Sequence, residues 1–262
     1  MAKVTNIGIG IRGTIGGVTY REVGGKTYLS RKPEIAPKRI KNSAEFANTR
    51  KLNNEFKGTV AATRGFVATI RTGINMTQGK GEELRRKVHK AMHRIKEMDK
   101  EGRYGERGIY VSRYGRMLDD MTIGTHNPTL STITDPTIER TEDGTVRLTL
   151  EAEMASEMRY ANGSTHTKVY LTLLGVSDYV YDERTREYRA ANTEAEGYSA
   201  TAESDYIPHS GRIEKDIVLT LKPEICSTEN VAIMAAYGVR HFKKCGERYV
   251  AMKNACGFKI RF

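Results

Sequence analysis

The hydrophobic pattern of this chain changes its period once, and that change constrains the fold more than any other feature. Residues 80–100 repeat apolar side chains every three or four positions, which is typical of an amphipathic helix. After residue 136 the apolar side chains alternate with polar ones, and β-branched residues become common, which is typical of half-buried strands. A helical part followed by a strand-rich part predicts an α+β fold.

The C-terminal part contains six segments with the alternation of strands, and turn residues separate several of them. Short strands at this spacing predict an antiparallel β-sandwich of the immunoglobulin-like type over residues 137–262. The polar stretch 182–197 is expected to be an exposed loop with a short strand at Tyr188. The six predicted strand segments are residues 146–153, 168–180, 198–207, 213–221, 231–239 and 248–262.

The N-terminal part begins with a predicted β-hairpin arm. Two β-prone runs within residues 13–31 flank Gly24 and Gly25, and this pair suits the primed turns of hairpins because both residues accept positive φ. An isolated hairpin is only marginally stable in water. The arm is therefore expected to pack on the rest of the chain or on a partner.

A basic linker is predicted between the hairpin and the helices. Pro33 and Pro37 disfavour helix, so the chain is expected to stay extended to residue 41, and residues 1–41 form the hairpin and its linker. Asn42, with Glu45 three positions later, has the pattern of a capping box and predicts the start of a helix.

Several helices are predicted between the linker and the sandwich, in a basic helical region of residues 42–121. The first is expected to end near residue 57, ahead of Gly58, and the last to cover residues 109–121. Residues 122–136 then form a second linker. The helix after Gly58 has an apolar face of Val60, Thr63, Val67, Ile70 and Ile74.

Charge divides the chain in the same way. Residues 1–120 carry 26 Lys and Arg against 12 Asp and Glu, a net charge of +14, whereas residues 121–262 carry a net charge of −3. Basic side chains can neutralise the phosphates of a nucleic acid, or they can meet an acidic protein surface, including that of another copy; the sequence leaves both open. The candidate contact residues are Arg31, Lys32, Lys38, Arg39 and Lys41 in a first cluster, and Arg85, Arg86, Lys87, Lys90 and Arg94 in a second.

The sequence contains no convincing motif for catalysis, a cofactor or a metal. Gly8, Gly10 and Gly13 have the spacing of a dinucleotide fingerprint, but a predicted hairpin follows them where a helix is required. His89 and His93 are four positions apart on a predicted helix, but the surrounding Lys and Arg disfavour a cation. The sequence has no nucleophile elbow, Walker loop or metalloprotease motif. We therefore expect a protein that is not an enzyme, with no catalytic residue, cofactor or metal.

No export signal or membrane helix is predicted. The first eight residues lack the apolar core of a signal peptide, and no stretch approaches the roughly 18 consecutive apolar residues of a membrane helix. Cys226, Cys245 and Cys256 are an odd number without the spacing of a zinc site, which fits reduced thiols. We expect a protein made in the cytoplasm that leaves it only within a larger assembly.

Two short patterns are distinctive. One contains Gly13, Gly16, Gly17, Tyr20, Gly25, Lys26, Tyr28, Arg31, Lys32, Pro33, Ser43, Phe46, Arg50 and Phe56; the other covers residues 231–237, a turn at Gly246 and the last strand. Together they resemble a domain family of unknown function found in Bacteroidetes and in their phages. The resemblance implies a Gly-rich hairpin, a basic linker, a helix and a C-terminal immunoglobulin-like sandwich, with no known activity. The hairpin tryptophan of that family is missing here, and residues 80–121 have no counterpart in it.

These observations favour a non-catalytic structural or assembly protein. The hairpin and the basic linker would dock on neighbouring subunits, which are copies of this chain or other assembly components, and a phage virion component is the most specific form. The alternative is a nucleic-acid-binding protein that uses residues 31–41 and 80–100. In both cases we expect an oligomer or a part of a larger assembly.

Overall fold

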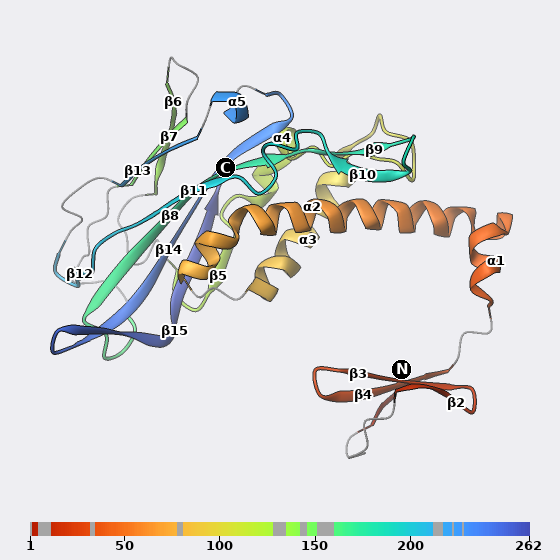
Figure 1. Ribbon diagram of the computed structural model, residues 1–262, viewed down its shortest axis with the longest axis horizontal. Helices are drawn as coiled ribbons and strands as arrows, with labels where there is room; N and C mark the ends of the chain where they lie inside the picture. The colour runs from red at the N-terminus through yellow and green to blue at the C-terminus, as the bar shows by residue number, and fades with distance from the viewer. Residues whose placement is uncertain are drawn as a thin grey trace. The chain divides into compact units, whose positions relative to one another are not determined.

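The chain forms two compact units, Met1–Arg50 and Lys51–Phe262 (Figure 1). Among the described residues, no helix combines the length and the apolar content needed to cross a membrane. The computed structural model describes residues 2–4, 12–31, 35–77, 81–127, 135–141, 146–150, 160–211, 217–221, 223–226 and 228–262.

The first unit contains an antiparallel sheet with the strand order β1-β4-β3-β2. The predicted hairpin is confirmed, with its turn at Gly24 and Gly25, which have φ angles of 57° and 71°. A second glycine pair, Gly16 and Gly17, also has positive φ and connects a further strand to the hairpin. The strands are β1 (Ala2–Val4), β2 (Gly13–Ile15), β3 (Val18–Val23) and β4 (Lys26–Arg31).

The prediction of an extended linker to residue 41 is wrong over its second half, where helix α1 (Pro37–Asn42) forms. Pro37 stands in the first turn of α1, where its missing N–H has no helical partner to lose and its fixed φ suits a helix. Asn42 ends α1, so the predicted cap at Asn42 is also wrong. Glu45 lies in the short 3₁₀ turn η1 (Ala44–Phe46), and its carboxylate accepts a hydrogen bond from Arg39 at 2.7 Å.

A single helix of 31 residues, α2 (Ala47–Thr77), replaces the two helices predicted on either side of Gly58. Gly58 packs against the ring of Tyr188, and a Cβ on it would lie 2.7 Å from that ring. A Cβ on Gly65 would lie even closer to the hydroxyl of Tyr179. Gly58, which the sequence predicted as a helix end, and Gly65 therefore give α2 the room to approach the rest of the unit.

The second unit is an α+β structure with an antiparallel β-sandwich, which confirms the predicted fold class; the immunoglobulin-like type stays a prediction. Each of the six predicted strand segments contains a strand, and the short strand at Tyr188 is confirmed. The large sheet contains β5 (Thr122–Gly124), β8 (His166–Ser177), β11 (Ser199–Glu203), β12 (Ile207–Pro208), β14 (Val231–Cys245) and β15 (Arg248–Arg261). The small sheet contains β6 (Thr137–Arg140), β7 (Val146–Leu150) and β13 (Ile217–Leu221), and a separate hairpin contains β9 (Tyr179–Asp182) and β10 (Glu187–Ala190).

Helices complete this unit. The strong predicted helix is confirmed as α3, and the short helix predicted after it forms as α4 followed by a 3₁₀ turn. Strand β5 lies within the second predicted linker, where it pairs with β15. The helical elements are α3 (Gly81–Met98), α4 (Val111–Tyr114), η2 (Gly115–Leu118) and α5 (Pro223–Cys226).

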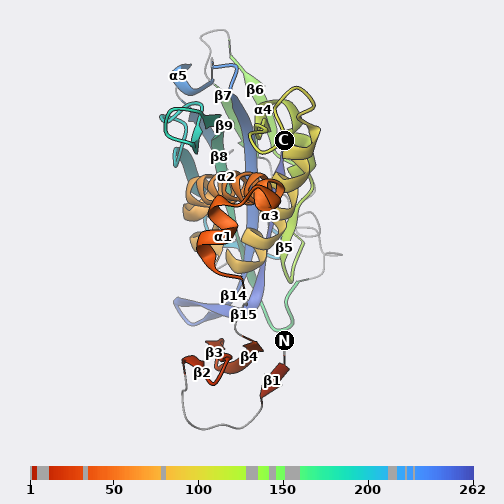
Figure 2. The same cartoon turned by 90° about the vertical axis from the view of Figure 1, so that its right-hand side faces the viewer.

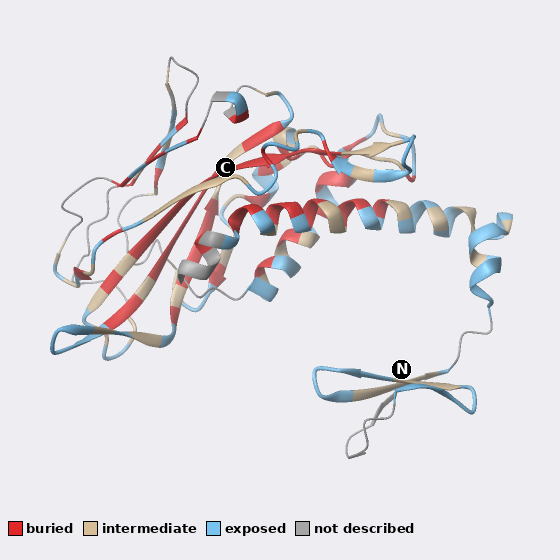
Figure 3. Cartoon of the chain, in the orientation of Figure 1, coloured by how far each residue is buried: buried red, intermediate tan, exposed pale blue. Residues whose placement is uncertain are grey.

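The large sheet has a core on each face because alternate residues of its central strands point to opposite sides. Leu171 and Leu173 of β8 pack toward the small sheet, whereas Leu174 and Val176 pack toward α2 and α3. The small sheet and the two helices lie on opposite faces of the large sheet (Figures 1 and 2). Strand β14 alternates in the same way, so β8 and β14 are buried over most of their length (Figure 3).

The helices and the large sheet share one core. Phe66 and Ile70 of α2 and Leu84 and Ile95 of α3 are fully buried in the cluster that also contains Phe258 of β15. The predicted domain scheme places the helices in a region of their own, whereas in the structure they form the third layer of the sandwich unit. Burial of the apolar stripe of α3 against a sheet explains the difference, since an amphipathic helix needs an apolar surface to cover it.

Candidate functional site

The N-terminal sheet has one apolar face. Directly paired residues of neighbouring strands point to the same side of a sheet, and the register pairs Ile15 with Val18 and Tyr20 with Leu29. These four side chains therefore lie on the same face. Val23 points to the opposite face, together with Thr14, Thr19, Arg21, Tyr28 and Ser30, whereas Glu22, Thr27 and Arg31 share the face of Tyr20 and Leu29.

This apolar face has no core behind it. None of residues 12–31 and 35–50 is buried, and in Figure 3 strands β2, β3 and β4 have only exposed and intermediate colours. The side chain of Ile15 is 60% exposed. A sheet that presents apolar side chains to solvent offers a surface that a partner can cover.

The first predicted basic cluster belongs to this unit. Arg31 ends β4 on the apolar face, opposite Val18, and Lys32 lies outside the described residues. Lys38 and Lys41 are exposed on α1, and the Arg39 guanidinium is held by Glu45.

The second predicted basic cluster lies on α3 and points in three directions. Arg85 is on the flank next to α2, while the exposed Arg86, Lys90 and Arg94 follow one another at intervals of four on the outer side. Lys87 is engaged within the chain: its Nζ atom donates a hydrogen bond to the carbonyl of Thr122 and pairs with Glu83 at 2.9 Å. Lys87 therefore connects α3 to β5 through this hydrogen bond.

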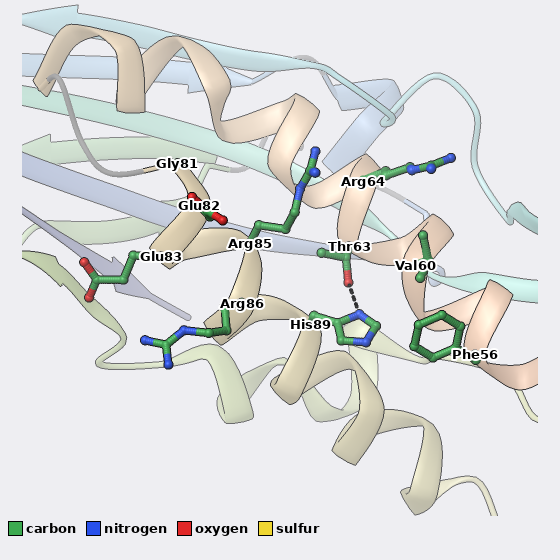
Figure 4. A pocket seen from close by; sticks show the side chains of 10 residues that line it. All are labelled: Phe56, Val60, Thr63, Arg64, Gly81, Glu82, Glu83, Arg85, Arg86 and His89. Carbon is green, nitrogen blue, oxygen red and sulfur yellow. Dashed lines mark hydrogen bonds between the residues drawn. The ribbon is translucent and has the colours of Figure 1, made fainter. Parts of the chain in front are cut away.

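A groove of ≈ 920 Å³ separates α2 from the N-terminal half of α3. Figure 4 shows Arg64 and Arg85 extending from the two helices, with Arg86 on the outer side of α3. Arg85 and Arg86 of the predicted cluster line this groove together with residues of α2 that were not predicted from the sequence as partner contacts. Its lining residues are Phe56, Val60, Thr63, Arg64, Gly81, Glu82, Glu83, Arg85, Arg86 and His89.

The arginines of this groove form no ion pair with a described residue. In the part of the chain that the structure describes, no carboxylate pairs with Arg64, Arg85 or Arg86, although all three are exposed. The two glutamates of the lining lie in the first turn of α3, where the helix dipole stabilises them. Cationic side chains gathered in this way raise the local positive potential.

An aromatic surface lies beside the arginines. The Phe56 side chain is 55% exposed, and its ring meets the His89 ring edge to face at 5.5 Å. The Thr63 hydroxyl donates to the Thr59 carbonyl, so the His89 Nδ1–H donates to the Thr63 oxygen at 3.3 Å. This contact fixes the orientation of the His89 ring (Figure 4).

A buried charge cluster joins α2 to α3 near the groove. Glu55 of α2 is 1% exposed and accepts a hydrogen bond from Lys96 of α3 at 3.0 Å. It also accepts two hydrogen bonds from Arg107, from Nε and from Nη2, each at 2.7 Å. Burial raises the pKa of the Glu55 carboxyl, but hydrogen bonds from Arg107, the Gly105 N–H and Lys96 outweigh it and lower the pKa to about 2. These contacts set the separation of the two helices.

Histidines gather at another place, inside the sandwich, and they were not predicted. His241 is fully buried, its Nδ1 lies 2.8 Å from the Thr167 hydroxyl, and its ring is 5.0 Å from that of His126. Burial lowers the pKa of His241 to about 3. Over the described ranges, no three His, Cys, Asp or Glu side chains are placed to hold a metal ion, and His93 of the sequence-level candidate pair contacts Glu97 at 3.3 Å.

Among the described residues, the apolar face of the N-terminal sheet and the groove between α2 and α3 stand out by their chemistry. Their chemistry is hydrophobic in the first case and cationic and aromatic in the second. Comparison with family models, with curated proteins and with solved structures gives no match to this chain.

Proposed function

We propose that this protein is a non-catalytic structural subunit that assembles with neighbouring subunits through its N-terminal sheet. The observation that carries the proposal is a sheet with an apolar face and no buried residue in β2, β3 or β4. Small sheets need to bury a hydrophobic face to be stable in water. A neighbouring subunit that covers Ile15, Val18, Tyr20 and Leu29 provides that burial.

Contact through the face is favoured over addition of a strand to the edge. The two outer strands of the sheet, β1 and β2, have three residues each. Short edge strands offer few unpaired backbone groups for another chain. The central strands β3 and β4 have six residues each and carry the apolar side chains, so the main contact area lies on the face.

Basic side chains of the same unit favour an acidic rim on the partner. Arg31 lies at the edge of the apolar face, and Lys38 and Lys41 are exposed in the same unit. Oppositely charged rims speed the association of subunits and fix their orientation. Residues 121–262 carry a net charge of −3, so this part of another copy is one source of such a rim. A subunit of a phage particle is the form of assembly that the family resemblance favours.

The first prediction is that Ile15→Glu prevents self-assembly. The wild-type chain should elute from size-exclusion chromatography with light scattering at a multiple of the mass of one chain. Ile15→Glu places a carboxylate on the apolar face and should give the single chain. Val23→Glu is the matched control, because Val23 is 53% exposed on the opposite face of the same sheet, and it should leave the mass unchanged. A wild-type protein that stays a single chain at high concentration would contradict self-assembly.

A further inference from the structure

The groove between α2 and α3 contains three arginines that take no part in the ion pairs of the described residues. Arg64, Arg85 and Arg86 have no carboxylate partner in the described part of the chain, whereas Lys96 and Arg107, which the fold uses, share Glu55. Uncompensated like charges repel one another. An anionic ligand removes that repulsion, which gives the groove a preference for negative charge.

The basic surface continues beyond the groove along α3. Arg86, Lys90 and Arg94 are exposed and recur at intervals of four, so each is displaced about 6 Å along the helix axis from the one before. A linear polyanion can follow such a row, whereas a compact anion uses one end of it. The ligand is therefore expected to be extended.

The acidic residues of the lining limit where this ligand lies. Glu83 is already paired with Lys87 on the side of α3 that faces β5. Glu82 is exposed in the first turn of α3 and repels phosphates there. The track therefore runs from the groove along the outer side of α3, away from the N-terminus of that helix.

Exposed aromatic surface distinguishes a nucleic acid from an acidic protein segment. Phe56 and Arg64 of α2 both line the groove, and Phe56 is more than half exposed. Nucleic acid bases stack on such rings regardless of their sequence, and their phosphates meet the neighbouring arginines. An acidic peptide would satisfy the arginines but would leave the ring unused.

We infer that the groove binds single-stranded nucleic acid without sequence preference, with a base on Phe56 and phosphates on Arg64, Arg85 and the row Arg86, Lys90 and Arg94. Bases of a single strand are free to stack, whereas those of a duplex are not. This inference does not depend on the proposed assembly, because the groove residues all belong to the second unit.

Fluorescence anisotropy with a labelled oligothymidylate of about 20 nucleotides tests it. The full-length wild-type chain should bind this strand, and raising the salt from about 50 to about 200 mM should weaken binding steeply. Arg85→Gln should weaken binding and lower the slope of log affinity against log salt by about 1. Phe56→Leu should weaken binding by roughly 5-fold or more with an unchanged salt slope, since it removes stacking and no charge.

Arg184→Gln is the matched control, because Arg184 is an exposed arginine on the turn between β9 and β10, outside the groove. It should change binding less than roughly 2-fold, in line with the loss of one distant charge. Thermal unfolding and light scattering of each variant should match the wild type, which separates loss of binding from loss of fold or of assembly.

Four results would overturn the inference. They are no binding by the wild type at low salt, equal loss in Arg85→Gln and Arg184→Gln, equal affinity for a duplex of the same length, and competition by polyglutamate as effective as that by the unlabelled strand. The last result would assign the groove to an acidic protein partner. A mononucleotide that binds as tightly as the strand would contradict the extended track along α3.

Discussion

At the scale of single residues, the most consequential group is the buried Glu55 carboxylate. It lies 41 residues from Lys96 and 52 from Arg107 in sequence, yet it accepts hydrogen bonds from both. Removing one member of a buried ion pair leaves the other charge buried without compensation, which costs more than the pair contributes. Lys96 is 3% exposed and would be left in that condition.

We predict that Glu55→Gln lowers the free energy of unfolding by about 3 to 5 kcal/mol, measured by urea denaturation at neutral pH. Glu97→Gln is the control, because Glu97 is exposed on α3 and contacts His93; it should cost less than about 1 kcal/mol. Equal losses in the two variants would show that the Glu55 cluster contributes no more than a surface pair.

The same carboxylate gives the unfolding a pH dependence with a defined sign. The pKa of Glu55 is about 2 in the folded chain, below its ordinary value of 4.5. Its contribution is therefore complete above pH 4.5 and is lost as the pH falls toward 2. Glu55→Gln should lose less stability than the wild type over that window, so the two free energies should converge.

Single-residue reasoning from sequence found only part of the groove. Arg85 and Arg86 were predicted because they lie in a run of basic residues. Arg64 and Phe56 were not, because they lie on a different helix and only the packing of α2 beside α3 places them at one groove. Lys87 illustrates the reverse case, since its charge suggested a contact with a partner and its amine instead binds the carbonyl of Thr122.

At the scale of elements, glycines decide how closely α2 approaches its neighbours. Glycine lowers helix stability by about 1 kcal/mol relative to alanine, so by propensity alone Gly58→Ala should stabilise α2. The ring of Tyr188 reverses that expectation, because the new Cβ would lie 2.7 Å from it. The Tyr188 ring is itself held by the hydrogen bond from its hydroxyl to the Arg107 carbonyl at 3.0 Å.

We predict that Gly58→Ala lowers the free energy of unfolding by roughly 1 to 3 kcal/mol, the range for inserting an atom into a packed site. Gly81→Ala is the control, because a Cβ at Gly81, the first residue of α3, meets nothing within 4 Å. It should be neutral or slightly stabilising. Thermal denaturation of both variants distinguishes the two cases, and a more stable Gly58→Ala would refute the packing role of this glycine.

The elements themselves were largely predictable, since the repeat of apolar residues identified α3 and the strands of the sandwich. The wrong predictions concern residues that are compatible with two different local structures. Pro37 reads as a helix breaker but suits a first helical turn, and Gly58 reads as a helix end but serves a close contact. Strand β5 was missed because three residues carry too little alternation to be recognised, and its pairing with β15 forms only in the folded chain.

At the scale of the whole molecule, the two units differ in what holds them together. The core clusters contain residues from Ala62 onward, and none of the described residues of Met1–Arg50 takes part in them. Separate cooperative units open with separate free energies, and a unit with little buried surface opens most easily. The hydrophobic period predicts the sandwich unit well for this reason, because that unit buries its apolar residues within the chain, whereas the core clusters include none of the described residues of the first unit.

This difference predicts two distinct patterns of amide hydrogen exchange. In dilute protein the amides of β3 and β4 should exchange far faster than those of β14, whose strand is buried for most of its length. Raising the protein concentration should slow exchange in β3 and β4, because association covers the apolar face, and should leave β14 unchanged. Ile15→Glu should remove that concentration dependence while Val23→Glu keeps it. Slow exchange of β3 and β4 at every concentration would mean that the sheet is stable without a neighbouring copy, and self-assembly through its face would then have no physical basis.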